Sequence, residues 1–308
     1  MKNLTLRQLR YAEALAAQRH FGRAAAVCAV SQPALSVQIK ALEAALGVPL
    51  FERGMRQVRL TGFGETFVER GREILRSVDE LGDLARAARE RHVGRLRIGV
   101  IPTVAPYLLP GIIGALSARY SGLDIHVRET LTPRLIRALK DGRIDTAIVA
   151  LPVSEPGLAE TALFSEDFVL VRPKPDAQKP VPDGEALRSM RLLLLEEGHC
   201  FRDQALSFCS ISSMTPRDGL DGSSLSTLVQ MVAAGIGVTL IPEMALDVET
   251  RATDVAVARF APPQPQRTIG MIWRQSSPLA DQLVDVSAVV AAAAGAMRQK
   301  AMPRRGAG

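Results

Sequence analysis

The sequence has few of the residues on which several classes of protein depend. Its 308 residues include three cysteines, one tryptophan and four histidines, and aromatic residues make up 4%. Three cysteines are too few for a disulfide-stabilised secreted domain, and none are spaced as CxxC, the pattern of a structural zinc site. We therefore expect no metal and no cofactor.

Long hydrophobic runs are also missing. A membrane-spanning helix needs about 20 mostly apolar residues, and the longest candidate, residues 231–242, is interrupted by glycines. The N-terminal segment MKNLTLRQLR lacks the apolar core of a signal peptide. These features predict a cytoplasmic protein with no membrane partner, and its length predicts at least two domains.

What the sequence does have is an uneven distribution of charge. The net charge is +6; residues 1–62 contain nine basic and three acidic residues, whereas the rest of the chain contains 29 of each. The whole positive excess thus lies in the first fifth of the chain. This is expected if only that segment approaches a polyanion such as DNA.

Helical periodicity supports a DNA-binding domain over residues 1–62. A first amphipathic helix begins near Leu4, a second covers about 21–28, and a tight turn at 29–31 leads to a third helix with Ser31 as its N-cap. A short basic hairpin follows at about 50–60. This order predicts a winged helix-turn-helix, although any trihelical core has similar spacing.

The third helix has one apolar face and one polar face, and the polar face can reach base edges or phosphates in the major groove. The predicted DNA-binding residues are Ser31, Gln32, Pro33, Ser36, Gln38 and Lys40 from this helix and Arg53 and Arg56 from the hairpin.

Residues 63–92 are predicted to form a linker helix. No proline occurs between residues 62 and 91, and apolar or small residues recur at intervals of three and four. The stripe consists of Phe63, Phe67, Gly71, Ile74, Val78, Leu81, Ala85 and Ala88. Such a near-heptad stripe favours a paired helix and therefore a dimer. Packing of the stripe on the C-terminal domain is the alternative.

From residue 93 to residue 308, strand-like and helix-like segments alternate. The predicted strands are LRIGVIP, LDIHVRE, TAIVALP, FVLVRP and GVTLIP, which indicate α/β sheets that are substantially parallel. We expect two lobes, lobe I at about 93–166 and 270–300 and lobe II at about 167–269. Thr103, Thr132, Ser223 and Ser224 follow strands, where they are expected to be helix N-caps, ligand-binding residues or both.

The segment FGRAAAVCAVSQPALSVQIKALEAALGVPLFERGMRQVRLTGFG, residues 21–64, resembles the N-terminal signature of the LysR-type transcriptional regulators. The linker helix and the two-lobed domain match that family over the whole chain. The resemblance implies a periplasmic-binding-protein-like effector domain, binding to double-stranded promoter DNA, contact with RNA polymerase, and a homotetramer formed from linker-helix dimers through the regulatory domains.

A narrower resemblance comes from GHCFRDQALSFC at 198–209, IPTVAPYLLP at 101–110, RTIG at 267–270 and SPL at 277–279, which are similar to the hydrogen-peroxide sensors of that family. It implies that Cys200 is the peroxidatic cysteine and Cys209 the resolving cysteine. The implied peroxide-binding residues are Thr103, Thr132, His199, Arg202, Asp203 and Arg267.

A Cys200–Cys209 disulfide would be a conformational switch. The spacing of Phe201, Ala205 and Phe208 predicts a helix in the reduced protein. A helix would separate the two Cα atoms by about 13 Å, whereas a disulfide requires about 7 Å or less. The segment must therefore unwind before the bond can form. His199 and Arg202 flank Cys200 and favour its reactive thiolate.

Other interpretations remain open at this stage. Two cysteines nine positions apart can be incidental, and His199, Cys200 and Cys209 could belong to a metal site, although only three donors are visible. The chain could instead be a LysR-type regulator that responds to a small organic inducer between the lobes. A thiol peroxidase that turns over is disfavoured because the N-terminal segment is devoted to DNA, so we expect a protein that is not an enzyme.

Overall fold

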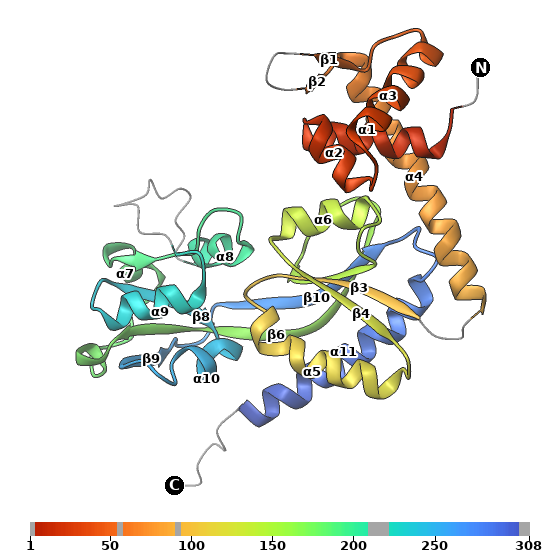
Figure 1. The fold of residues 1–308 in the computed structure, drawn as a ribbon. Helices are drawn as coiled ribbons and strands as arrows, with labels where there is room; N and C mark the ends of the chain where they lie inside the picture. The colour runs from red at the N-terminus through yellow and green to blue at the C-terminus, as the bar shows by residue number, and fades with distance from the viewer. Residues whose placement is uncertain (1–3, 54–57, 90–93, 209–221, 302–308) are drawn as a thin grey trace. The chain divides into compact units, whose positions relative to one another are not determined.

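A computed structural model describes residues 4–53, 58–89, 94–208 and 222–301 (Figure 1). The chain divides into two compact units, Met1–Ala85 and Arg86–Gly308. After the functions that the sequence predicts for them, we call the first the DNA-binding unit and the second the regulatory unit.

The DNA-binding unit is a trihelical core followed by a two-stranded hairpin and a long helix. Its elements are α1 (Leu6–Gln18), α2 (Phe21–Val27), α3 (Gln32–Leu46), β1 (Phe51–Arg53), β2 (Val58–Leu60) and α4 (Gly62–Arg89). The hairpin strands pair antiparallel. The buried side chains of α1, α2 and α3 form one core with Leu50, Phe51 and Val68. The predicted winged helix-turn-helix is confirmed.

Local capping explains where the third helix begins and ends. Ser31 is the N-cap of α3, and its hydroxyl accepts a hydrogen bond from the backbone N–H of Ala34 at 3.4 Å. Pro33 occupies the first turn, where no N–H is needed. Gly47 ends the helix with a left-handed φ of 74°. These three residues fix the position of the predicted recognition helix.

The apolar residues of the predicted stripe on α4 do not share one environment: some are buried and others are exposed. Gly71 is buried against α1, where an added Cβ would lie 3.3 Å from Cδ2 of Leu9. Phe63, Ile74 and Leu81 are instead exposed. One strip of α4 thus packs within the DNA-binding unit, and a second apolar strip is exposed on this chain. The side chains of Ala85 and Ala88 lie outside the described residues.

The regulatory unit has two lobes. The elements of lobe I are β3 (Arg95–Val100), α5 (Ala105–Arg119), β4 (Asp124–Glu129), α6 (Thr132–Lys140), β5 (Thr146–Leu151) and α11 (Ala280–Ala301). The elements of lobe II are η1 (Lys174–Asp176), α7 (Gly184–Ser189), β7 (Leu192–Leu193), α8 (Cys200–Phe208), α9 (Leu225–Ala233), β8 (Val238–Pro242), η2 (Glu243–Ala245), α10 (Leu246–Glu249) and β9 (Val255–Arg259). Each lobe has its own hydrophobic core.

Two long strands, β6 (Leu158–Pro173) and β10 (Gln266–Arg274), join the lobes. The sheet order is β4-β3-β5-β10-β6-β8-β7, with β9 also paired to β6. The first half of β6 pairs with β10 and its second half with β8 and β9. Figure 1 shows these two strands running from one lobe to the other. The chain therefore crosses between the lobes at two adjacent places.

The expectation of a substantially parallel sheet is wrong. β3 pairs parallel with β4 and β5, and β7 with β8, but β10 is antiparallel to both of its neighbours and β6 is antiparallel to β8 and β9. The physical reason is the return of the chain: β10 re-enters lobe I from lobe II and can only pair in the opposite direction. The predicted α/β class and the two lobes are confirmed.

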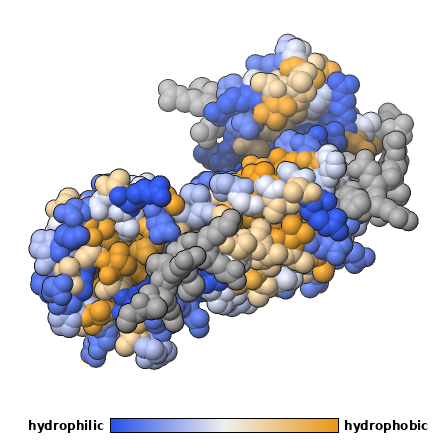
Figure 2. Space-filling view, turned by 90° about the horizontal axis from the view of Figure 1, so that it is seen from below, coloured by the Kyte–Doolittle hydropathy of each residue, from blue (hydrophilic) through white to orange (hydrophobic). Residues whose placement is uncertain are grey.

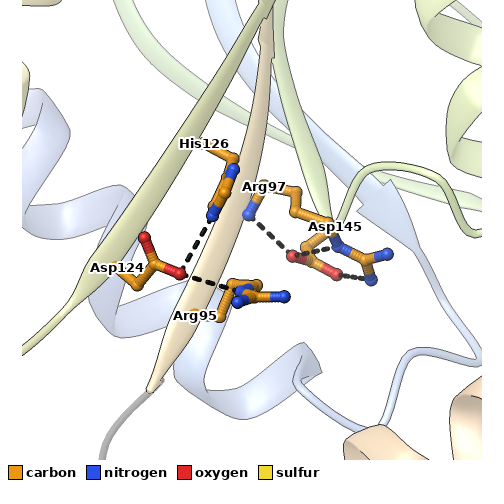
Figure 3. A network of polar contacts seen from close by, with 5 residues as sticks. All are labelled: Arg95, Arg97, Asp124, His126 and Asp145. Carbon is orange, nitrogen blue, oxygen red and sulfur yellow. Dashed lines mark hydrogen bonds and ion pairs between the residues drawn. The ribbon is translucent and has the colours of Figure 1, made fainter.

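Ion pairs hold the amino ends of the lobe I strands together (Figure 3). The carboxylate of Asp145 accepts from the backbone N–H of Arg97 at 2.7 Å and from its guanidinium at 2.6 and 3.1 Å. Asp124 contacts Arg95 and His126, each at 2.9 Å. The hydrogen bonds of its carboxylate with His126 and Arg95 hold the pKa of Asp124 below its usual value. All of these contacts lie at the amino ends of β3, β4 and β5, and none of them involves a residue at the carboxyl ends of these strands.

One helix is long and apolar enough to cross a membrane by length and composition alone, residues 280–298 of α11. Its residues Leu283, Val286, Val290 and Ala294 are buried in the core of lobe I, and α11 packs beside α5. The helix thus contributes part of the core of lobe I.

We expect Gly64→Ala to destabilise the DNA-binding unit by about 1 to 3 kcal/mol, because a Cβ at residue 64 would lie 2.1 Å from the carbonyl oxygen of Leu50. Gly62→Ala is the matched control, since no atom of the described residues lies within 4 Å of the place its Cβ would take. Hydrogen exchange of residues 6–53 in the full chain measures the effect. Equal protection in the two variants would contradict the prediction.

Candidate functional site

Cys200 lies where the two lobes meet. It is the first residue of α8, it is half-buried, and it packs against the core of lobe I. The next residue, Phe201, is buried in the core of lobe II, with its ring 4.8 Å from the ring of Phe168. The start of α8 is thus anchored in one lobe while its thiol faces the other. The predicted helix is confirmed for residues 200–208; Cys209 lies outside the described residues.

A buried ion pair stands at the junction of the lobes. The guanidinium of Arg267 on β10 donates from Nε to Oε1 of Glu166 on β6 at 2.8 Å, and both side chains are fully buried. The other carboxylate oxygen of Glu166 accepts from the backbone N–H of Met244 at 3.2 Å. The same guanidinium lies 5.3 Å from the ring centroid of Phe201. This ion pair therefore links β6, β10 and two segments of lobe II.

Arg267 also fixes Thr103, which lies between β3 and α5. Its Nη1 donates to the hydroxyl oxygen of Thr103 at 2.8 Å, and its Nη2 donates to the carbonyl oxygen of the same residue at 3.0 Å. Because a threonine hydroxyl has a single hydrogen and accepts here, that hydrogen is available to donate. The N-cap position of α5 is Val104, so the expectation that Thr103 is an N-cap is wrong.

Thr132 is also not an N-cap. It is the first residue of α6, whose N-cap is Leu131 and has no side-chain cap. The hydroxyl oxygen of Thr132 is buried and forms no hydrogen bond within the described part of the chain. Gly198, two residues before Cys200, has a left-handed φ of 92°, and a Cβ there would lie 3.2 Å from Leu131. The start of α6 therefore packs closely on the loop that leads to Cys200.

His199 is 8% exposed. Burial lowers the pKa of its imidazole, while the carboxylate of Glu196 opposes that shift. The ring is therefore neutral at pH 7, when one of its nitrogens can donate a hydrogen bond and the other can accept one.

The other predicted pocket residues have different surroundings. Arg202 is buried, and its Nη1 donates to the carbonyl oxygen of Leu195 at 2.8 Å, which fixes the start of α8 to the preceding segment. Asp203 is exposed. Ser224 is the N-cap of α9 and accepts from the backbone N–H of Thr227 at 3.2 Å, so that capping prediction is confirmed.

A cavity of about 380 Å³ lies between the lobes. Thr103, Tyr107 and Leu131 line it from lobe I, and His199, Ser224 and Glu249 line it from lobe II. The structure thus brings Thr103 and His199 to one cavity.

Among the described residues, no cluster of three or more potential metal-binding side chains occurs.

In the DNA-binding unit, five of the six predicted α3 residues are exposed and Ser36 is half-buried. The side chains of Arg53 and Arg56 are outside the described set. Val37 was missed by the sequence analysis although it is 61% exposed on the same helix. The signal was its position outside the apolar stripe formed by Leu35, Ile39 and Leu42, and an exposed apolar side chain there can contact a thymine methyl group.

A DNA-binding head followed by a helix and a two-lobed α/β domain defines a transcription regulator. The family of lysR-type bacterial regulatory helix-turn-helix proteins matches residues 6–65, and the LysR substrate-binding domain matches residues 89–294. The chain belongs to the LysR family.

Two relatives are similar to this chain over most of its length. The chain is 43% identical over 291 residues to a probable hydrogen peroxide-inducible genes activator of Streptomyces viridosporus, covering 93% of both chains. It is 41% identical over 278 residues to the DNA-binding transcriptional dual regulator OxyR of Escherichia coli K12, covering 90% of this chain and 91% of the relative.

Two solved structures are similar over nearly the whole chain. A full-length OxyR variant from Pseudomonas aeruginosa has a TM-score of 0.72 at 37% identity, covering 94% of this chain and 95% of the other. A hydrogen-peroxide-bound OxyR mutant from Corynebacterium glutamicum has a TM-score of 0.66 at 35% identity, covering 97% and 95%.

We expect Arg267→Ala to lower the free energy of unfolding of the regulatory unit by about 3 to 5 kcal/mol, because it leaves the buried Glu166 carboxylate without its cation. Fluorescence of Trp273, the single tryptophan of the chain and part of β10, reports the transition. The double variant Glu166→Gln, Arg267→Ala should regain part of the loss. A loss below about 1 kcal/mol in the single variant would show that the pair is dispensable.

Proposed function

We propose that this LysR-family regulator senses hydrogen peroxide through Cys200 and converts the oxidation into a change in how it binds promoter DNA. The observation that supports this most is the position of Cys200, whose thiol faces lobe I while the adjacent Phe201 is anchored in lobe II. A covalent change at that sulfur acts on the contact between two separate cores. The names of the relatives favour the same function.

The chemistry takes two steps. The thiolate of Cys200 attacks one oxygen of hydrogen peroxide, the O–O bond breaks, and the second oxygen leaves as water after taking up a proton, which gives a sulfenic acid. The thiolate of Cys209 then attacks the sulfur of Cys200, the S–O bond breaks, and a second water leaves as the disulfide forms. The peroxide is reduced by two electrons and the two thiols are oxidised.

The site offers hydrogen-bonding groups for the peroxide. Thr103 keeps its hydroxyl hydrogen because its oxygen already accepts from Arg267. The buried hydroxyl of Thr132 has no partner among the described residues, and it therefore suits a small polar ligand. We assign peroxide binding to these two hydroxyls and to His199. Arg267 positions Thr103, and we propose that Arg202 and Asp203 shape the peroxide site by fixing the start of α8.

The disulfide acts as a switch because α8 is helical from Cys200 to Phe208. The helix must unwind before Cys209 can approach Cys200. Its end is held by the contact of the Phe208 ring with Phe260, with ring centroids 5.1 Å apart. Unwinding therefore also changes the core of lobe II.

The response needs an oligomer. We propose that the exposed residues Phe63, Ile74 and Leu81 of α4 pair two chains and that the regulatory units join the dimers into a tetramer. Figure 2 shows hydrophobic residues among polar ones on the face of the regulatory unit that it draws. The assembly binds promoter DNA and contacts RNA polymerase in the cytoplasm. It reacts once per signal and is not an enzyme that turns over.

A small organic inducer is the second candidate, and the cavity of about 380 Å³ between the lobes favours it. Such a ligand would leave the thiols unchanged. Thiol counting before and after peroxide treatment separates the two functions.

We expect Cys200→Ser to abolish the change in promoter footprint that micromolar peroxide causes in the wild-type protein, because serine forms no sulfenic acid. Cys28→Ser is the matched control and should respond normally. Burial, together with the carboxylate of Glu13, raises the pKa of the Cys28 thiol, which leaves less reactive thiolate. A footprint that still changes in Cys200→Ser would refute the sensing role.

We also expect Lys40→Ala to weaken operator binding and to reduce the slope of log affinity against log salt concentration by about one, because its exposed ammonium group is assigned to a DNA phosphate. Lys174→Ala, an exposed lysine of η1, is the control. Binding measured by fluorescence anisotropy at several salt concentrations provides both slopes. An unchanged slope in Lys40→Ala would remove this residue from the interface.

A further inference from the structure

Tyr107 and Glu249 connect the two lobes on the wall of the cavity. The hydroxyl of Tyr107, on α5 in lobe I, donates to Oε1 of Glu249, at the end of α10 in lobe II, at 2.7 Å. The two residues are 142 positions apart, and Tyr107 packs against the core of lobe II. Thr103 and His199 line the same cavity. This hydrogen bond is therefore a direct polar contact between the lobes beside the predicted site.

Both partners are held in place for this contact. Burial and the adjacent Glu249 carboxylate raise the pKa of Tyr107 far above its usual value, so the phenol remains a donor. Glu249 ends a short helix that Thr250 and Thr253 stabilise: their hydroxyls donate to the carbonyl oxygens of Leu246 at 2.8 Å and Glu249 at 3.2 Å. The acceptor thus has a fixed backbone.

The hydrogen bond between Tyr107 and Glu249 also restrains the turn of the chain that contains Thr103. Tyr107 is one helical turn after Thr103, and its backbone N–H donates to the carbonyl oxygen of Val104 at 3.2 Å. Arg267 holds the beginning of this turn through Thr103, and Glu249 holds its end through Tyr107. The first anchor lies at the junction of the lobes and the second lies in lobe II.

We propose that Tyr107 and Glu249 are positioning residues for the oxidation of Cys200. This proposal rests on the proposed function. A peroxide held between Thr103 of lobe I and Cys200 of lobe II requires the two lobes at a fixed separation, because attack along the O–O axis tolerates little misplacement. The chain crosses between the lobes at adjacent segments near β6 and β10, and the Tyr107–Glu249 hydrogen bond restricts their remaining relative motion.

The test measures the second-order rate constant for oxidation of Cys200 in the full chain, by trapping the sulfenic acid and quantifying it by mass spectrometry. We expect Tyr107→Phe and Glu249→Ala each to slow the reaction by about threefold to tenfold, the effect of one hydrogen bond. Glu249→Gln keeps an acceptor oxygen and should stay within about twofold of the wild type. Tyr120→Phe, which alters the other end of α5, is the control.

A double-mutant cycle identifies the bond as the cause. If the two residues act through one contact, the variant carrying both Tyr107→Phe and Glu249→Ala is no slower than either single variant. Rate losses that multiply in the double variant, or single variants that oxidise as fast as the wild type, overturn the proposal. Glu249→Gln as slow as Glu249→Ala also overturns it.

The outcomes also separate this inference from the function on which it rests. If peroxide does not oxidise Cys200 in the wild-type protein, the sensing function fails and the positioning role fails with it. If the wild type reacts and Tyr107→Phe reacts equally fast, only the positioning role fails. Trp273 fluorescence on unfolding shows that each variant is folded.

Discussion

The ion pair between Arg267 and Glu166 is the contact on which the rest of the regulatory unit depends. Two opposite charges without solvent contact are stable only when their hydrogen-bonding capacity is used, and here Arg267, Glu166, Thr103 and the backbone of Met244 satisfy one another. The pair sits where β6 and β10 cross between the lobes. It therefore fixes the crossing and orients the hydroxyl of Thr103 with the same set of bonds.

Around this fixed point, the site is built from contacts of different strength. Phe201 anchors the start of α8 in a close-packed core, whereas Cys200 only packs on the surface of the opposite core. The hydroxyl of Thr132, without a partner among the described residues, lowers the stability of the arrangement unless a small polar molecule pairs with it. The backbone next to Cys200 is therefore fixed in lobe II through Phe201, whereas the contact of Cys200 itself with lobe I is a surface contact that can change.

The sequence was most informative where the relevant contacts are local. Ser31 could be predicted to begin α3 because a cap depends on neighbouring residues, and the helical spacing of Phe201 and Ala205 was enough to predict α8. The same reasoning failed for Thr103, which looked like a cap because the partner that claims its hydroxyl, Arg267, lies 164 positions away. Local sequence patterns also did not predict β10. Its antiparallel pairing with β5 arises because the chain returns from lobe II to lobe I along this strand.

For the candidate site, the sequence allowed several of its residues to be predicted, but not the residues with which they form contacts. Thr103 and His199 do line one cavity, but the family resemblance, not the spacing of the residues, brought them together. Glu166 and Tyr107 drew no attention, because an acidic residue in a strand and a tyrosine in a helix become informative only when their buried partners are known. The stripe on α4 was similarly ambiguous, since only packing shows that Gly71 contacts α1 while Ile74 is exposed.

The continuous helix α4 has a mechanical consequence. Its 28 residues span about 42 Å at a rise of about 1.5 Å per residue. A tilt of about 10° at its regulatory end would carry the other end sideways by about 7 Å, the length of about two base-pair steps in DNA. A helix of this length turns a small change of tilt at one end into a displacement at the other end that exceeds the spacing of neighbouring phosphates along a DNA strand.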